Sequence, residues 1–411
     1  MATGTWTLET LAGTWFGGVK RGPVEPWHMT VGVGPALLSL APASAGRWAL
    51  LVGSFVLLLL GAEIFTNGVE WLGRRLGVSE SATGSILAAV GTALPETMIP
   101  VIAILQGDVA AEEVGVGAIL GAPFMLATIA MFLVGVSVYY FADRRVYDGE
   151  MRIDTVSTRR DISFFLVGYT LAFLAALVRN RTVSVAIGVL LVGLYVFYLY
   201  RSLRSGELVA EEELDDLHLG LLAERFEGLV PGRPVEDHSG DPHVLLVGAQ
   251  TVLALALIIV GAHLFVTEVR WVSATVLGIP TAIVALLLAP LATELPEKFN
   301  SVLWLSRDKD TLALGNITGA MAFQGTLPVT LGILFTSWNL SFTWGTTGFL
   351  NGLSALLAIL SGAILYLRTR SPGNRQLTPR PFLVGGLFYL VFIGIVVYHV
   401  VVLQVSGAHG A

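Results

Sequence analysis

Two carboxylates stand directly after prolines inside apolar stretches of the chain. Glu96 follows Pro95 in "AVGTALPETMIP", and Glu297 follows Pro296 in "LAPLATELPEKFNS". A proline has no backbone N–H and clashes with the carbonyl one turn earlier, so each should open a helix and free carbonyl oxygens for a cation. A buried ionisable group in a membrane costs at least about 2.5 kcal/mol and is rarely present without a function. Both acids are therefore candidate cation ligands.

Hydroxyl groups accompany both acids at the same spacing. Thr92 precedes Glu96 by four residues and Thr293 precedes Glu297 by four, which places each pair on one helical face. A hard cation takes about six to eight oxygen ligands. Two carboxylates, two hydroxyls and several carbonyls would supply such a set.

The composition indicates which elements must position these groups. Of 411 residues, 54% are hydrophobic and only 13% are charged, and the mean hydropathy is +0.75. Apolar runs of about 20 residues, long enough to cross a bilayer as helices, recur along the chain. We predict an all-α integral membrane protein with ten spans, near 49–70, 80–106, 115–141, 162–178, 182–201, 244–268, 278–305, 311–336, 347–367 and 382–404. The chain has no cysteine, which excludes a disulfide framework and a thiolate metal site.

The spans divide the chain into predicted regions. Residues 1–48 form an N-terminal extension that is signal-like or an extra helix, and 405–411 form a C-terminal tail. Two five-helix repeats, 49–203 and 244–404, flank an acidic loop at 204–243. Most of the 24 Lys and Arg residues then fall in loops on one side. By the positive-inside rule, the sequence predicts a multi-pass cell-membrane protein whose 204–243 loop is cytoplasmic.

The two halves resemble each other in sequence. The segment from Gly61 to Glu96, which begins "GAEIFTNGVEW", matches the segment from Gly261 to Glu297, which begins "GAHLFVTEVRW". Because five is an odd number, two such copies have opposite orientations in the membrane. This predicts inverted repeats with Pro-broken helices that meet at the midplane, as in secondary transporters.

These motifs, in this order, resemble the sodium/calcium exchanger family of the cation/calcium antiporter superfamily. The similarity covers roughly residues 49–404 and rests on "GTALPE", "ATELPE", the later "GAILGA" and "GNITGA", and the leading "GAEIF" and "GAHLF". It implies ten helices, alternating access, and calcium exchanged for sodium or protons. Carried over by position, it implies Thr92, Glu96, Thr293 and Glu297 as ion ligands, with Glu96 and Glu297 as the metal-binding acids.

The chain departs from the family pattern mainly in its first half. Positions that are usually polar in the family hold apolar or small residues here: Ala93, Pro100, Ala118, Ala122, Pro123 and Leu126. The second half keeps Asn316 and Ser301 as modulating residues and has Gln324 where an acid is usual. It also gains Glu294 and Lys298, four residues apart in the orientation that favours a helical ion pair.

Two interpretations of Lys298 stay open. Lys298 either neutralises Glu294 and leaves a site built from Glu96 and Glu297, or acts as a tethered cation that replaces one bound ion. With Glu294 as a further ion-binding or coupling residue, three carboxylates would lie close together. They cannot all stay charged in an empty site, which gives a physical basis for proton coupling.

Other function classes are weaker. Without a G-x-S-x-G or H-E-x-x-H motif, a membrane enzyme is not expected. We predict a secondary active cation antiporter. The alternatives are a proton-linked monovalent cation exchanger and a non-transporting homologue. The expected partners are inorganic cations, calcium first among them, and the lipid bilayer. Neither a resident cofactor nor a nucleic acid is expected, and the oligomeric state is left open.

Overall fold

The computed structural model describes residues 43–75, 93–146, 149–178, 180–204, 216–219, 242–338, 340–369 and 376–408. Thr92, the side chains of residues 295–297, and most of the predicted extension and acidic loop lie outside this description. The chain falls into two units, Met1–Gly46 and Arg47–Ala411. The second unit holds all of the elements below except the first residues of α3.

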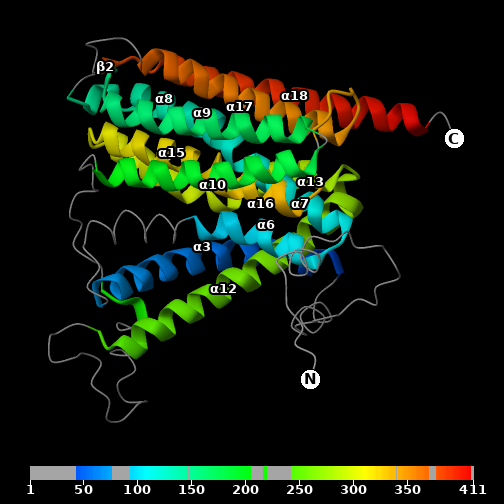
Figure 1. Cartoon of the computed structure of the whole chain (residues 1–411), viewed down its shortest axis with the longest axis horizontal. Coiled ribbons are helices and arrows are strands. Elements are labelled where there is room, and N and C mark those ends of the chain that lie inside the picture. The colour runs from blue at the N-terminus through cyan, green and yellow to red at the C-terminus, as the bar shows by residue number, and fades with distance from the viewer. Residues whose placement is uncertain are drawn as a thin grey trace, which may run out of the picture. The chain divides into compact units, whose positions relative to one another are not determined.

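The described part of the first half forms a series of helices that coincide with its predicted spans, of which residues 80–92 lie outside the description (Figure 1). They are α3 (Ala43–Arg75), α6 (Leu94–Gln106), α7 (Val109–Met125), α8 (Met131–Tyr140), α9 (Thr155–Leu177) and α10 (Arg181–Arg204). Gly107 ends α6 in the left-handed conformation, and the Asp108 carboxylate accepts a hydrogen bond from the Ala111 amide to cap α7.

A short π-helical segment, η2 (Leu126–Ala130), joins α7 to α8. It follows Pro123, which has no N–H for the carbonyl one turn earlier. The Leu126 amide then contacts the carbonyls of both Ala122 and Pro123. The helix thus continues through the proline with a local change of register.

The second half repeats this pattern. Its helices are α12 (Val244–Trp271), α13 (Thr281–Thr293), α14 (Leu295–Leu305), α15 (Asp310–Gln324), α16 (Leu327–Phe335), α17 (Thr347–Thr369) and α18 (Arg380–Ala408), with a π-helical segment η4 (Val272–Leu277) after α12. The predicted span 311–336 coincides with the apolar segment Asp310–Phe335, within which Gly325 and Thr326 separate α15 from α16. This interruption corresponds to the η2 segment of the first half.

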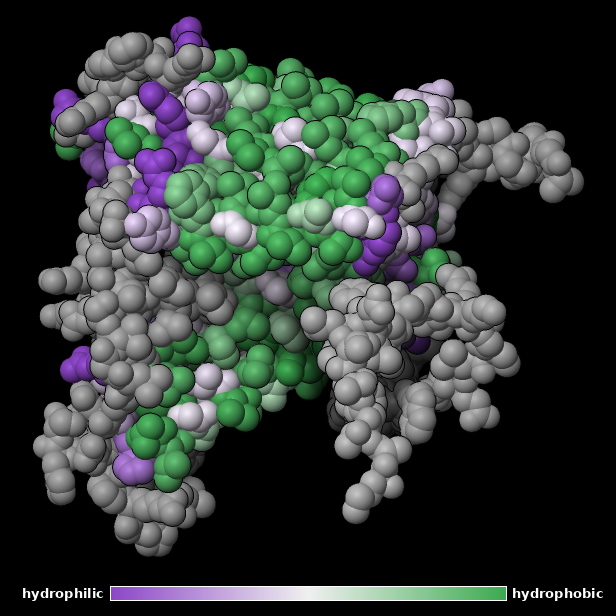
Figure 2. All heavy atoms as spheres, in the orientation of Figure 1, coloured by the Kyte–Doolittle hydropathy of each residue, from purple (hydrophilic) through white to green (hydrophobic). Residues whose placement is uncertain are grey.

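Eight of the described helical segments are long and apolar enough to cross a membrane. Two shorter apolar helices, Leu94–Gln106 and Thr281–Leu291, belong to the two spans that carry the Pro-Glu motifs. Figure 2 shows an apolar belt over the helices, with hydrophilic residues gathered at its two margins. These features make the chain an integral membrane protein of about ten spans.

The inverted repeat is visible where α3 crosses α12. A Cβ atom added to Gly61 would lie 2.7 Å from Ile258, and one added to Gly261 would lie 3.1 Å from Leu58. Each half therefore contributes the glycine of its "GA" motif to the same crossing, 200 positions apart. In Figure 1, α3 and α12 lie along each other.

A buried ion pair fastens one end of the bundle. Strands β1 (Met151–Arg152) and β2 (Gln376–Leu377) pair there in antiparallel fashion. Arg145 Nη2 lies 2.7 Å from Asp310 Oδ2, and Arg145 Nη1 donates to the Leu305 carbonyl. Since both charged side chains are fully buried, they tie the segment after α8 to the segment between α14 and α15.

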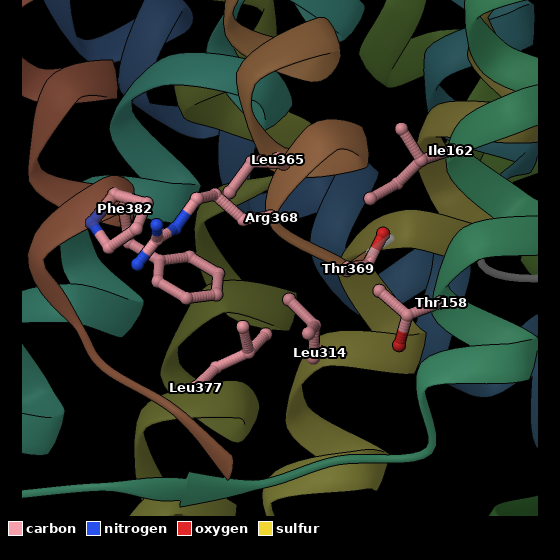
Figure 3. A pocket seen from close by; sticks show the side chains of 9 residues that line it. Thr158, Ile162, Leu314, Leu365, Arg368, Thr369, Leu377 and Phe382 are labelled. Carbon is pink, nitrogen blue, oxygen red and sulfur yellow. The ribbon is translucent and has the colours of Figure 1, made fainter. Parts of the chain in front are cut away.

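A small cavity lies between α9, α15, α17, β2 and α18 (Figure 3). Its lining includes Thr158, Ile162, Leu314, Leu365, Arg368 and Phe382. Thr158 is in the first turn of α9 and Arg368 in the last turn of α17. The cavity therefore lies at helix ends and apart from the interruptions that carry the Pro-Glu motifs.

Candidate ion site

The helix interruption at the Pro-Glu motif of the second half is a single residue. Helix α13 ends at Thr293 and α14 begins at Leu295, with Pro296 in the first turn of α14. Glu294 stands between the helices with φ −88° and ψ −24°, close to helical values. The predicted break is therefore a local interruption and not an unwound stretch, although the proline still withholds one N–H from the ladder.

Three polar side chains from three helix ends meet at this interruption. Lys298 Nζ lies 3.0 Å from Glu294 Oε2, as the spacing of the two residues predicts. Gln324 Nε2, at the last position of α15, lies 3.4 Å from Glu294 Oε1. Glu294 is 0% exposed and Lys298 3%. A charged pair this deeply buried is held by its own partners and not by water.

More polar groups extend this cluster along α14 and α15. Ser301, on α14, is buried, and its hydroxyl lies 3.5 Å from Asn316 Nδ2 on α15. Thr293, also buried, donates from its hydroxyl to the Ala289 carbonyl. The second half therefore places carboxylate, amide, hydroxyl and ammonium groups on adjoining faces of α13, α14 and α15.

The first half offers a different environment around Glu96. This residue is 7% exposed and lies in the first turn of α6, next to Pro95. Its neighbour Thr97 donates from its hydroxyl to the Ala93 carbonyl at 2.9 Å. Pro100 lies inside α6 and supplies no N–H to the carbonyl one turn earlier, at Glu96. Where the family has a serine hydroxyl, this chain has Pro100. The proline offers no hydroxyl, but it leaves the Glu96 carbonyl without the N–H that residue 100 would otherwise donate.

Helix α7 serves packing in place of ligation. Ala118, Ala122 and Leu126, at the positions where polar groups were sought, are all buried. Cβ atoms added to Gly117 or Gly121 would lie 2.2 Å from carbonyl oxygens of α13. The backbones of α7 and α13 therefore touch, and the residues at these positions of the α7–η2 segment offer no side-chain ligand.

The structure thus brings some of the predicted site residues together, and others lie outside the described part of the chain. Glu294, Lys298 and Gln324 form one cluster, and Ser301 adjoins Asn316. Thr92 and the side chain of Glu297 lie outside the description. Among the described residues, no three His, Cys, Asp or Glu side chains gather as a metal site. The predicted site needs Glu297, whose backbone in α14 is one residue from Lys298.

Three buried acids escaped the sequence reasoning, and one of them is Asp310, the partner of Arg145. Glu268 on α12 is 1% exposed, its oxygens have no hydrogen-bond partner among the described residues, and Arg47 Nη1 lies 3.6 Å away. Asp161 on α9 accepts a hydrogen bond from the Thr318 hydroxyl at 2.9 Å. Glu268 ends the predicted span 244–268, which was the available signal, whereas Asp161 follows two arginines outside the predicted span 162–178 and gave no such signal. By contrast, two other titratable side chains in predicted spans, Glu63 on α3 and His263 on α12, are exposed.

Inverted five-helix repeats with acids at interrupted helices define the class of secondary ion transporters. A family model described as "Sodium/calcium exchanger protein" matches residues 46–204 and 247–401. The chain belongs to the sodium/calcium exchanger family, whose members are exchangers and not enzymes.

Two relatives match about two thirds of the chain. "Putative antiporter CaxA" of Alkalimonas amylolytica is 24% identical over 274 residues, which cover 67% of this chain and 76% of the relative. An uncharacterized membrane protein of Methanocaldococcus jannaschii is 23% identical over 265 residues, 64% of this chain and 74% of that protein.

Solved structures show the same fold. The crystal structure of an H+/Ca2+ exchanger, CAX, matches with a TM-score of 0.63 at 16% identity, covering 90% of this chain and 89% of that one. A structure of the sodium-calcium exchanger NCX_Mj matches with a TM-score of 0.50 at 18% identity, covering 85% and 97%. At these identities the likeness concerns the fold alone.

Proposed function

We propose that this protein is a secondary active antiporter that exchanges calcium for sodium or protons by alternating access. The observation that carries the proposal is Glu96, a buried carboxylate in the first turn of the apolar helix α6, with the symmetry-related motif at Glu297. A carboxylate costs too much in a bilayer to remain there without a cation partner. CAX and NCX_Mj, which share the fold, are described as H+/Ca2+ and sodium-calcium exchangers.

The ligand set follows from both halves. Glu96 and Glu297 supply the charge, Thr92 and Thr293 supply hydroxyls, and the carbonyls that Pro95 and Pro296 leave without an N–H supply further oxygens. A hard cation prefers oxygen ligands of this kind. Gln324 and Glu294 adjoin the set, while Ser301, Asn316 and Lys298 tune it.

The protein's placement is part of the proposal. Residues 49–203 and 244–404 form the two repeats within the cell membrane, and the intervening loop, 204–243, faces the cytoplasm. With this orientation the Arg145–Asp310 pair closes the cytoplasmic end of the bundle. Inorganic cations and lipid are then the partners of the chain.

A second candidate is a proton-linked monovalent cation exchanger on the same scaffold. The apolar positions on α7 and the Lys298 ammonium, 3.0 Å from Glu294, favour it. Both features reduce the number of oxygens and negative charges available to a divalent ion.

Flux measurements separate these functions. The purified chain would be reconstituted in liposomes, and uptake of calcium-45 and the signal of an internal pH dye would be followed across imposed sodium and proton gradients. Calcium uptake driven by either gradient supports the proposal. Cation-driven proton movement without calcium uptake supports the second candidate, and no flux with folded protein supports a non-transporting homologue.

A further inference from the structure

The Lys298–Glu294 pair is a buried ion pair at a helix interruption. It lies where α13 gives way to α14, with Nζ and Oε2 3.0 Å apart and both side chains almost fully buried. Gln324 donates to the second oxygen of Glu294 at 3.4 Å. The carboxylate is thus met on both oxygens by groups of this chain.

The first half has no such pair. Counting from each Pro-Glu motif, Ala93 stands at the place of Glu294 and Thr97 at the place of Lys298. The pair is an addition to one half only. Burying two ions costs more than burying apolar residues of similar size, and the pair lies at the helix interruption itself. This energetic cost is explained if the pair belongs to the ion site.

The fixed charges can now be counted. The ammonium of Lys298 balances Glu294, so Glu96 and Glu297 remain to be balanced by transported ions. Those two carboxylates are neutralised equally by one divalent cation or by two monovalent cations. The carrier then bears the same charge in both of its loaded forms.

We propose that Lys298 is a built-in cation at the ion site, so that exchange of one divalent cation for two monovalent cations moves no net charge across the membrane. This inference rests on the proposed antiport function. It assigns Lys298 and Glu294 to the stoichiometry of transport and not only to the stability of the α13–α14 interruption.

The experiment uses the full chain in liposomes with potassium and valinomycin to set the membrane potential. Calcium-45 uptake driven by an outward sodium gradient is measured at zero potential and at an inside-negative potential. If sodium does not drive the wild-type protein, an outward proton gradient takes its place. The proposal expects the same accumulation at both potentials for the wild-type protein.

The decisive variant is Lys298→Met, which leaves Glu294 as a third carboxylate. A third monovalent ion is then needed per cycle, and one net charge moves. An inside-negative potential of about 100 mV should lower the calcium accumulation ratio by roughly 50-fold. The double variant Glu294→Gln/Lys298→Met loses both charges and should again be independent of potential. Lys298→Arg keeps the positive charge, so whatever uptake it retains should also be independent of potential.

A purely structural role for Lys298 would lower the amount of folded protein without changing the response to potential. Wild-type uptake that already responds to potential, or folded Lys298→Met protein that does not, overturns the inference. Should Lys298→Met fail to fold, the wild-type protein and the double variant decide: potential-dependent uptake by either one overturns it. Absence of any gradient-driven uptake by the wild-type protein contradicts the antiport function instead, so the two failures are distinguishable.

Discussion

The two halves of the chain carry the same motif in unlike surroundings. Around Glu96 the neighbouring positions hold Ala93 and Pro100, and α7 presses its glycines onto α13. In the equivalent region beside Glu297, Lys298 and Gln324 both contact Glu294. The comparison teaches that an inverted repeat preserves a backbone crossing and a Pro-Glu motif while the neighbouring side chains diverge. Under the proposed function, the second half would therefore tune the ion site.

The largest effect is expected where the halves agree. Glu96→Gln and Glu297→Gln each remove one of the two charges that a transported cation needs, so gradient-driven uptake should fall to the level of empty liposomes. Glu150→Gln, an exposed acid in the loop after α8, is the matched control and should transport normally. Normal uptake by either site variant would show that the motif is not a ligand there.

The next effect concerns the charge pair of the second half. Glu294→Gln leaves the buried Lys298 ammonium without its carboxylate, which should cost about 3–5 kcal/mol of stability. Thermal unfolding in detergent measures this loss. The double variant Glu294→Gln/Lys298→Met should recover most of it. Per folded molecule, Glu294→Gln should keep measurable transport, unlike Glu96→Gln, and equal transport by the two variants would contradict the distinction.

A smaller effect tests the packing role of α7. Gly121→Ala would place a Cβ atom 2.2 Å from the Leu286 carbonyl oxygen, and overpacking of this kind costs about 1–3 kcal/mol. Gly53→Ala on α3 has no atom within 4 Å of the added Cβ. It should be neutral or slightly stabilising, because alanine favours a helix over glycine. Equal unfolding midpoints for both variants would contradict the close contact of α7 with α13.

The smallest effects come from single neutral ligands. Ala122→Ser adds a hydroxyl to the first half, and Ser301→Ala removes one from the second. One hydrogen bond or weak ligand is worth about 1 kcal/mol, roughly fivefold in affinity. The first variant should tighten and the second loosen the apparent affinity for calcium in uptake assays. Shifts in the reverse directions would mean that these side chains face away from the ion.

Much of this architecture could be predicted from sequence. Ten apolar runs marked the spans, the two Pro-Glu motifs marked the inverted repeat, and the spacing of Glu294 and Lys298 marked their ion pair. All of these signals are local or periodic. The interruption after Gln324 also has a local signal, because it contains Gly325 and is followed by Pro328. The continuous apolar run nevertheless indicated a single helix there.

Contacts between distant helices could not be predicted. The approach of Gln324 to Glu294 depends on how α15 packs on α14, and the pairing of Glu268 with Arg47 depends on how α12 packs on α3. The apolar character of α7 looked like lost ligands because its contact with α13 is invisible in sequence. Hydropathy reports whether a segment is buried and not which neighbour buries it.

The central claim is that Glu96 and Glu297, one from each half, form a single cation site. Equilibrium binding of calcium-45 to the purified protein tests it most directly. The account predicts one saturable calcium ion per chain, lost completely in either Glu96→Gln or Glu297→Gln. Two independent sites, of which each variant loses only its own, would contradict it, and so would calcium binding that survives both substitutions together.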